Sequence, residues 1–175
     1  MHQYVVLFRG FNTGQIRMKK DQLDLLLSRL NFSRYLIIGT TGNILIETRK
    51  SLKETKEKIV DELKRYFQQE IPVFILLFSD FLKNENIFEE KENDIQHYIL
   101  FCNQNMKEIL LDDFSKKDFP LEQLQSINCG LYWTTPKGHT LKGFGKKALN
   151  AKYKYDLTSR NINTINKIVE CIKTW

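Results

Sequence analysis

The side chains best suited to bind a ligand lie in residues 158–164, a polar run at the expected start of the last helix. We expect Thr158 or the serine after it to cap this helix. Early backbone N–H groups and the positive end of the helix dipole would then lie near Arg160, Asn161 and Asn163, which suits a phosphate or a carboxylate. A structural interpretation competes with this one, because asparagines at a helix start often bond the local backbone and Arg160 would equally pair with an acidic segment.

No motif in the chain signals catalysis. A serine or cysteine nucleophile needs a base, and the three histidines lie near a terminus, at a strand start and in a basic turn. The adjacent carboxylates at 89–90 and 112–113 lie in acidic stretches, where a solvated surface is the ordinary explanation. The residues considered are His2, His97, His139, Glu89, Glu90, Asp112 and Asp113. The sequence therefore names no catalytic residue.

A glycine-rich basic stretch near residue 140 resembles two known signatures without completing either. Lys142-Gly-Phe-Gly145 matches the first half of an RNA-recognition signature but lacks the aromatic second half that would stack bases. Gly138 and Gly143 have the spacing of a phosphate-binding loop, but Phe144 stands in place of its lysine. What remains is a basic loop whose backbone N–H groups would face an anion.

The first half of the chain predicts a ferredoxin-like fold. Apolar runs indicate buried strands, two glycines mark a hairpin between the second and third strands, and apolar residues at helical spacing indicate two helices. A capping box, Ser51 with Glu54, begins the second helix. The order is strand, helix, strand, strand, helix, strand, the split βαβ arrangement. The expected strands are 4–8, 35–38, 43–47 and 73–78, and the expected helices are 18–30 and 52–67.

The second half predicts a smaller α+β unit that ends in a helix. We expect a ferredoxin-like unit over residues 1–79, an acidic linker with a short helix over 80–95, and the second unit over 96–175. No sequence repeat relates the two halves, so the order of strands in the second half stays open. The expected elements there are strand 97–101, helix 105–114, one or two strands in 126–135, a short helix in 146–152, and the last helix.

Charge is distributed unevenly along the 175 residues, whose net charge is +6. Lys and Arg outnumber Asp and Glu by 9 to 2 in residues 137–175, whereas residues 80–136 carry 5 basic and 11 acidic side chains. This pattern fits an anionic partner for the basic segment, and it equally fits attraction between the two segments across the fold.

The cysteines and the apolar runs indicate a cytoplasmic protein. Cys102, Cys129 and Cys171 are widely spaced and lack the spacing of a zinc site, so we expect reduced, buried thiols and neither a metal nor a cofactor. The apolar run at the N-terminus is too short for the core of a signal peptide. No run approaches the length of a membrane-spanning helix.

Three motifs resemble those of the domain-of-unknown-function family 1697. The first motif is residues 9–14, after the first strand; the second is 41–43, before the third strand; the third is 158–164. Their order and spacing resemble the family, and Phe11, Gln15, Thr41 and Ile162 depart from its usual residues. The resemblance implies a two-part α+β protein and no established activity. It makes a shared ligand site plausible at Arg9, Asn12, Gly14, Gly42, Asn43, Arg160, Asn161, Asn163 and Thr164.

Three functions fit these observations. In the first, the protein binds an anionic ligand, a phosphorylated small molecule or a nucleic acid, through the basic segment and the motif loops. In the second, it is a small enzyme for an anionic substrate, with Arg9 and Arg160 as electrostatic stabilisers. In the third, the motifs form a structural polar network that ties the two units together. For the first two functions, we expect the loops of the first and second motifs to face the start of the last helix.

Overall fold

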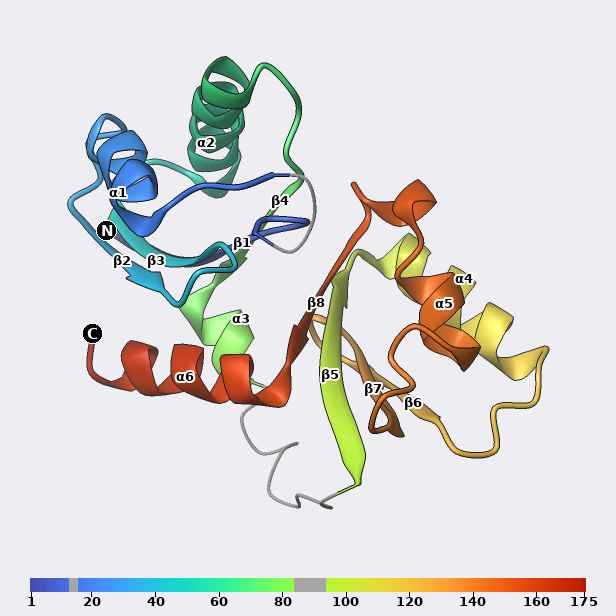
Figure 1. The fold of residues 1–175 in the computed structure, drawn as a ribbon. Coiled ribbons are helices and arrows are strands. Elements are labelled where there is room, and N and C mark those ends of the chain that lie inside the picture. Colours follow the sequence, from blue (N-terminus) through green and yellow to red (C-terminus); the bar gives the residue numbers. More distant parts are fainter. Residues whose placement is uncertain (13–15, 84–93) are drawn as a thin grey trace. The chain divides into compact units, whose positions relative to one another are not determined.

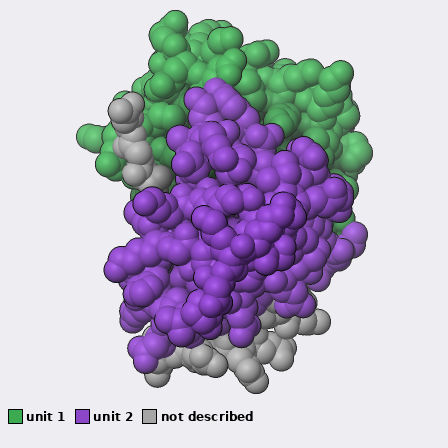
Figure 2. Space-filling view, turned by 90° about the vertical axis from the view of Figure 1, so that its right-hand side faces the viewer, with its two compact units in different colours: residues 1–81, 171–175 green, residues 82–170 purple. Residues whose placement is uncertain are grey.

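The computed structural model describes residues 1–12, 16–83 and 94–175. The chain divides into two compact units, shown in different colours in Figure 2. Unit 1 comprises residues 1–81 together with 171–175, and unit 2 comprises residues 82–170. Most of the expected acidic linker, residues 84–93, lies outside the described residues. In the described part of the chain, no helix is long and apolar enough to cross a membrane.

Unit 1 has the predicted ferredoxin-like topology (Figure 1). Its sheet has the strand order β2-β3-β1-β4, and every neighbouring pair is antiparallel. The capping box at Ser51 is formed, and it begins α2 as expected. In chain order the elements are β1 (His2–Phe8), α1 (Lys20–Ser28), β2 (Arg34–Ile38), β3 (Asn43–Thr48), α2 (Leu52–Phe67), β4 (Val73–Leu77) and the short α3 (Phe78–Leu82).

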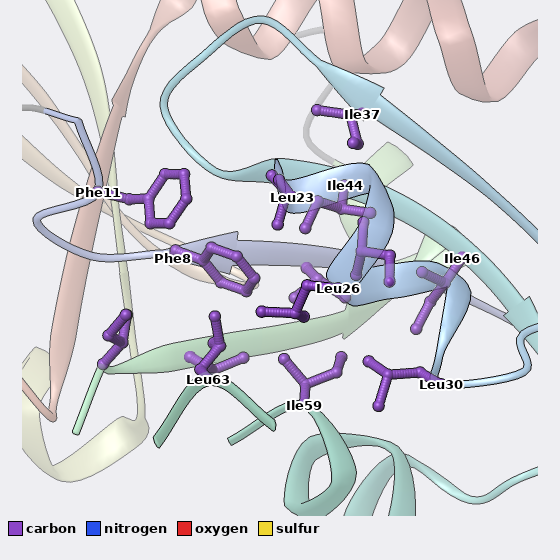
Figure 3. Packing of buried hydrophobic residues seen from close by; sticks show 14 of the residues in the cluster. Phe8, Phe11, Leu23, Leu26, Leu30, Ile37, Ile44, Ile46, Ile59 and Leu63 are labelled. Carbon is purple, nitrogen blue, oxygen red and sulfur yellow. The ribbon is translucent and has the colours of Figure 1, made fainter. Parts of the chain in front are cut away.

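The core of unit 1 lies between its sheet and the two helices α1 and α2 (Figure 3). Alternate residues of β1 point to this core, because successive side chains of a strand face opposite sides of a sheet. The buried apolar residues of α1 and α2 recur at helical spacing, so each helix turns one apolar face to the sheet. The central members of this core are Tyr4, Val6, Phe8, Leu23, Leu26, Leu27, Ile44, Ile46, Ile59 and Leu63.

Unit 2 repeats the topology of unit 1, element by element. Its strand order is β6-β7-β5-β8, again with antiparallel neighbours, so β5, β6, β7 and β8 correspond to β1, β2, β3 and β4. The sequence did not reveal this repeat. The elements are β5 (Ile95–Cys102), α4 (Gln104–Ser115), β6 (Gln123–Ile127), β7 (Gly130–Pro136), α5 (Gly143–Ala148), the 3-10 helix η2 (Ala151–Tyr153), β8 (Leu157–Asn161) and α6 (Ile162–Lys173).

The prediction that Thr158 or Ser159 caps the last helix is wrong. Residues 157–161 form β8, which pairs with the central strand β5, and α6 begins only at Ile162. The side chain of Asn161 accepts a hydrogen bond from the Thr164 backbone N–H at 2.9 Å, so this asparagine caps the helix. In residues 157–161, backbone N–H and C=O groups form hydrogen bonds with β5, so they do not need the hydrogen bonds of a helix.

The last turn of α6 belongs to unit 1. The ring of Trp175 meets Phe78 edge to face, with 5.7 Å between the ring centroids. The guanidinium of Arg34 lies 4.2 Å from the centroid of the same ring, in cation–π contact. The chain end is therefore packed against residues that adjoin the first sheet.

Replacing Leu26 by alanine should destabilise unit 1. Leu26 is buried in α1 and its truncation removes contacts with the sheet, so the free energy of unfolding should fall by about 2–4 kcal/mol. The neighbouring Leu25 is 58% exposed, and its replacement should change the free energy by no more than about 0.5 kcal/mol. Urea denaturation of both variants measures the difference; equal losses would contradict the packing described for α1.

Candidate functional site

Asn12 of the first motif holds two segments of unit 1 together. Its side-chain amide donates to the backbone carbonyls of Met18 at 2.8 Å and Thr40 at 2.7 Å, and its carbonyl oxygen accepts the Met18 N–H at 2.8 Å. Its φ of +56° lies in the left-handed region, which asparagine tolerates better than most residues. Asn12 therefore joins the loop after β1 to the turn between β2 and β3. Gly14, in the same motif, lies outside the described residues.

The second motif shapes the hairpin between β2 and β3. Gly42 has φ +72°, and a Cβ there would lie 2.7 Å from the Cβ of Phe8, so a side chain would collide with the core. The buried side-chain amide of Asn43 donates to the Ile38 carbonyl at 3.3 Å and to the Thr41 hydroxyl at 3.1 Å. Both residues thus have roles inside unit 1, in agreement with a structural interpretation of this motif.

Arg9 lies directly after β1, where its backbone N–H donates to the Pro72 carbonyl at 3.0 Å. Next to this loop, a hollow of about 470 Å³ opens at the start of α1. Its charged lining is basic, because Arg17 and Lys19 are the charged side chains among the described residues that line it. The guanidinium of Arg17 donates to the Asn12 carbonyl at 2.6 Å. The described residues that line it are Asn12, Arg17, Met18, Lys19, Gln22 and Thr40.

Arg160 of the third motif is a buried cation on β8, with 9% of its surface exposed. Both contacts described for its Nη1 atom are to neighbours in the same strand, the Thr158 hydroxyl at 3.1 Å and the Ser159 carbonyl at 2.8 Å. Burial lowers the pKa of the guanidinium to about 10. The group therefore stays protonated at neutral pH and keeps a full positive charge within the fold.

The other polar residues of the third motif lie at the start of α6. Asn161 caps the helix through the backbone N–H of Thr164, as described above. Asn163 is exposed in the first turn of the helix. The third motif thus contains a buried cation in a strand and a cap at the helix that follows.

The three motifs divide between the two units. The first and second motifs lie in unit 1, where the bond from Asn12 to Thr40 brings their loops together. The third motif lies in unit 2. The expected meeting of all three around one ligand stays a prediction.

The glycine-rich stretch at residues 142–145 serves to dock the short helix α5. The Glu122 carboxylate accepts the Phe144 backbone N–H at 3.0 Å and the Trp133 indole N–H at 2.8 Å. A Cβ on Gly143 would lie 1.9 Å from the Glu122 carboxylate, and one on Gly145 would lie 2.0 Å from the Thr140 carbonyl. These glycines allow the close approach, and a carboxylate of the protein itself occupies the start of α5.

This arrangement corrects the expectation that the basic loop presents its backbone N–H groups to an external anion. Phe144 is fully buried among the rings of Trp133, Phe114 and Phe119, so it is a core residue and cannot stack bases. The incomplete match to the RNA-recognition signature is therefore explained by packing.

The cysteines carry no sign of reactivity or metal binding among the described residues. All three are free thiols, and burial raises the pKa of Cys102 to about 11, which disfavours the reactive thiolate. No group of three or more His, Cys, Asp or Glu side chains in the described part of the chain is placed to hold a metal ion.

Two polar contacts of unit 2 had no signal in the sequence. Glu122 lies 11 residues from Trp133 and 22 from Phe144, and its role depends on how β7 and α5 pack. His97 and Tyr132 are hydrogen-bonded from Nδ1 to the hydroxyl, and their rings stack with centroids 5.9 Å apart. Only the pairing of β5 with β7 brings these two residues together.

Fold and site together define a class, α+β proteins with two ferredoxin-like units in series. A family model described as "Protein of unknown function (DUF1697)" matches residues 1–132. The chain therefore belongs to this family, as the resemblance of its motifs predicted. The third motif lies beyond the matched residues, so the match itself covers only the first two.

A solved structure shares the fold of the whole chain. It is described as the structure of conserved bacterial protein SP0830 from Streptococcus pneumoniae, and it matches with a TM-score of 0.79. The two sequences are 21% identical, and the match covers 99% of each chain. At this identity the likeness establishes the fold alone. Comparison with curated proteins gives no match.

Replacing Gly42 by alanine should destabilise the protein more than the same change at Gly39. Both glycines have a positive φ, +72° and +63°, but only Gly42 would place its Cβ against Phe8. The strained backbone should cost about 1–2 kcal/mol in each variant, and the collision should cost Gly42→Ala about 1–3 kcal/mol more. Urea denaturation measures this difference, and equal losses would show that the Phe8 contact does not constrain the second motif.

Replacing Glu122 by glutamine should loosen the docking of α5. A glutamine keeps the size of the side chain, but it carries no charge and only one acceptor oxygen for the Trp133 and Phe144 donors. The free energy of unfolding should fall by about 1–3 kcal/mol. Urea denaturation measures the change, and Glu108→Gln on the exposed surface of α4 is the control. A loss no larger than that of the control would refute the anchoring role of Glu122.

Proposed function

We propose that the protein binds single-stranded nucleic acid through a lysine-rich surface of unit 2. The observation that carries the proposal is a group of five exposed lysines between β7 and β8, in a segment with one acidic residue, Asp156. We call these five the lysine surface: Lys137, Lys142, Lys146, Lys152 and Lys154. Exposed lysines release counterions when they contact phosphates, which favours binding to a polyanion.

Part of the basic charge of unit 2 is already neutralised. Lys147 pairs with Asp113 at 2.5 Å, and Lys116 pairs with Asp112 at 2.5 Å. The first pair joins the basic segment to the acidic middle of the chain, so mutual attraction accounts for some of the charge pattern. Neither of these paired lysines belongs to the lysine surface. The five lysines of that surface are more than half of the nine basic residues in residues 137–175.

Aromatic side chains accompany two of the lysines. The ammonium of Lys152 lies 4.5 Å from the ring centroid of Tyr153, and that of Lys154 lies 4.8 Å from the ring centroid of Tyr155. Tyr155 is 50% exposed, which leaves ring surface for a base. Lysines beside exposed rings favour single strands, because unpaired bases stack on aromatic faces while lysines contact the backbone.

Removing three lysines of this surface should weaken binding and its dependence on salt. In a variant with Lys142, Lys146 and Lys154 changed to glutamine, the slope of log K against log salt should become shallower by about 2, because each phosphate contact on a single strand contributes roughly 0.7. Fluorescence anisotropy with a labelled oligonucleotide, measured across a series of salt concentrations, gives the slope.

A second triple variant separates the position of the lysines from the total charge. Lys53, Lys56 and Lys58 are exposed on α2 of unit 1, and their change to glutamine lowers the net charge by the same amount. This control should keep the slope of the unaltered protein. Equal effects of the two triple variants, or no salt-sensitive binding at all, would refute the proposal.

A further inference from the structure

The hollow at the start of α1 has the size of a small-molecule site. Its volume of about 470 Å³ lies within the range of roughly 300–1,000 Å³ that is usual for such sites. Asn12 and Thr40 both line it, so it lies where the loop after β1 meets the turn between β2 and β3. All of its described lining residues belong to unit 1, and we call it the unit 1 hollow.

Asn12 fixes the shape of the unit 1 hollow. Its side-chain amide donates to the carbonyls of Met18 and Thr40, and its side-chain oxygen accepts the Met18 N–H. These bonds occupy the polar atoms of the side chain, so Asn12 positions the surrounding backbone and leaves contact with a ligand to its neighbours. A wall held in this way costs a ligand little free energy for ordering the protein.

The two cations of the unit 1 hollow are not neutralised by the protein. Arg17 and Lys19 are exposed, and neither forms an ion pair with any described residue. Elsewhere in unit 1, by contrast, Arg29 pairs with Glu62. The bond from Arg17 Nη1 to the Asn12 carbonyl uses only part of the donor set of a guanidinium. The hollow therefore offers positive charge and N–H donors to an anion.

The start of α1 adds to the positive potential of the unit 1 hollow. Lys19 is the N-cap residue of α1, and its side chain makes no capping hydrogen bond. Lys19 and Lys20 thus bring two cations to the positive end of the helix dipole, an arrangement that costs free energy. Asp21 is the acidic residue of the first turn, but it is not among the described residues that line the hollow. An anion in the hollow would consequently stabilise the start of α1.

We propose that the unit 1 hollow binds a small molecule that carries a phosphomonoester, with Arg17 and Lys19 on the phosphate. A phosphomonoester has a charge near −2 at neutral pH and three terminal oxygens, so it matches two cations better than a carboxylate does. The phosphate group would fill only a small part of the hollow, which leaves room for the organic part of the ligand. The lysine surface belongs to unit 2, so this site is a separate one.

Nuclear magnetic resonance of the full chain labelled with 15N tests the site directly. Titration with phenyl phosphate should move the backbone amide signals of residues 17–22 and of Thr40 along one saturable curve. The amide signals of Lys146 and Lys152, which belong to the lysine surface, are the controls and should stay in place at the concentrations that saturate the hollow. Because binding favours the folded state, the melting temperature should rise with phenyl phosphate concentration.

Two further compounds identify the chemical group that is bound. Inorganic phosphate should move the same signals at higher concentration, because it lacks an organic part. Benzoate, which has the ring but only one negative charge, should bind about tenfold or more weakly than phenyl phosphate. Equal affinities for benzoate and phenyl phosphate would overturn the assignment of a phosphomonoester.

Two variants identify the residues that bind. Arg17→Gln and Lys19→Gln each remove one cation, and each should weaken phenyl phosphate binding by about tenfold or more. Lys58→Gln, on the exposed surface of α2, removes the same charge elsewhere in unit 1 and should leave the affinity unchanged. Melting curves establish that each variant is folded.

The titration of the unaltered protein tests the site even where a variant does not fold. No saturable movement of residues 17–22, or equal movement of Lys146 and Lys152, would overturn the proposal. An unchanged affinity in folded Arg17→Gln and Lys19→Gln variants would also overturn it. None of these results bears on the oligonucleotide experiment, so the two proposals fail independently.

Discussion

The pairing of β8 with β5 determines the chemistry available to unit 2. Because Arg160 lies opposite Ile99 in this pairing, its side chain faces away from the core formed with α4 and α5. A shift of one residue would turn it into that core, since alternate residues of a strand face opposite sides. The same pairing ends at Asn161, which leaves the asparagine free of helical backbone geometry and able to cap α6. The register between β8 and β5 therefore determines both the side of the sheet on which Arg160 lies and the residue at which α6 begins.

A second constraint, the Glu122 carboxylate, holds the short helix α5 against β7. Six residues are too few for a helix to be stable by itself, so α5 depends on its contacts. The carboxylate compensates the positive end of the helix, and Phe144 and Ala148 bury its apolar side in the core of unit 2. The lysines on either side of these buried residues are consequently held at the surface on an ordered segment.

The sequence predicted unit 1 well because local patterns and topology agree there. Its strands are apolar and its second helix begins at a capping box, so each element could be identified without knowledge of its partners. Unit 2 differs, because β6 is largely polar and β8 reads as a polar run before a helix. These strands exist because β7 and β5 pair with them, and pairing over long separations cannot be inferred from one segment. The repeated topology was hidden for the same reason.

The candidate residues follow the same division between local and long-range signals. Turn residues such as Gly42 and Asn12 stood out by type, but their roles depend on Phe8 and on backbone carbonyls that the sequence does not place nearby. The bond between His97 and Tyr132 spans 35 residues and became visible only through strand register. Residue type thus indicated which positions have an unusual backbone or polar role. Only the contacts in the structure show which of these residues support the fold.

The two units differ in the side chains on the sheet face opposite their core helices, which are α1 and α2 in unit 1 and α4 and α5 in unit 2. In unit 1 this face has an apolar centre, and Val5 and Leu45 are fully buried. Arg34, on the edge strand β2, and Phe78, just after β4, receive Trp175 from the chain end, so unit 1 draws part of its packing from the C-terminus. In unit 2 the equivalent row contains a phenol and a guanidinium. Burying a charged group costs free energy that a leucine would not, so the hydrogen bonds of Arg160 to Thr158 and Ser159 must offset part of that cost.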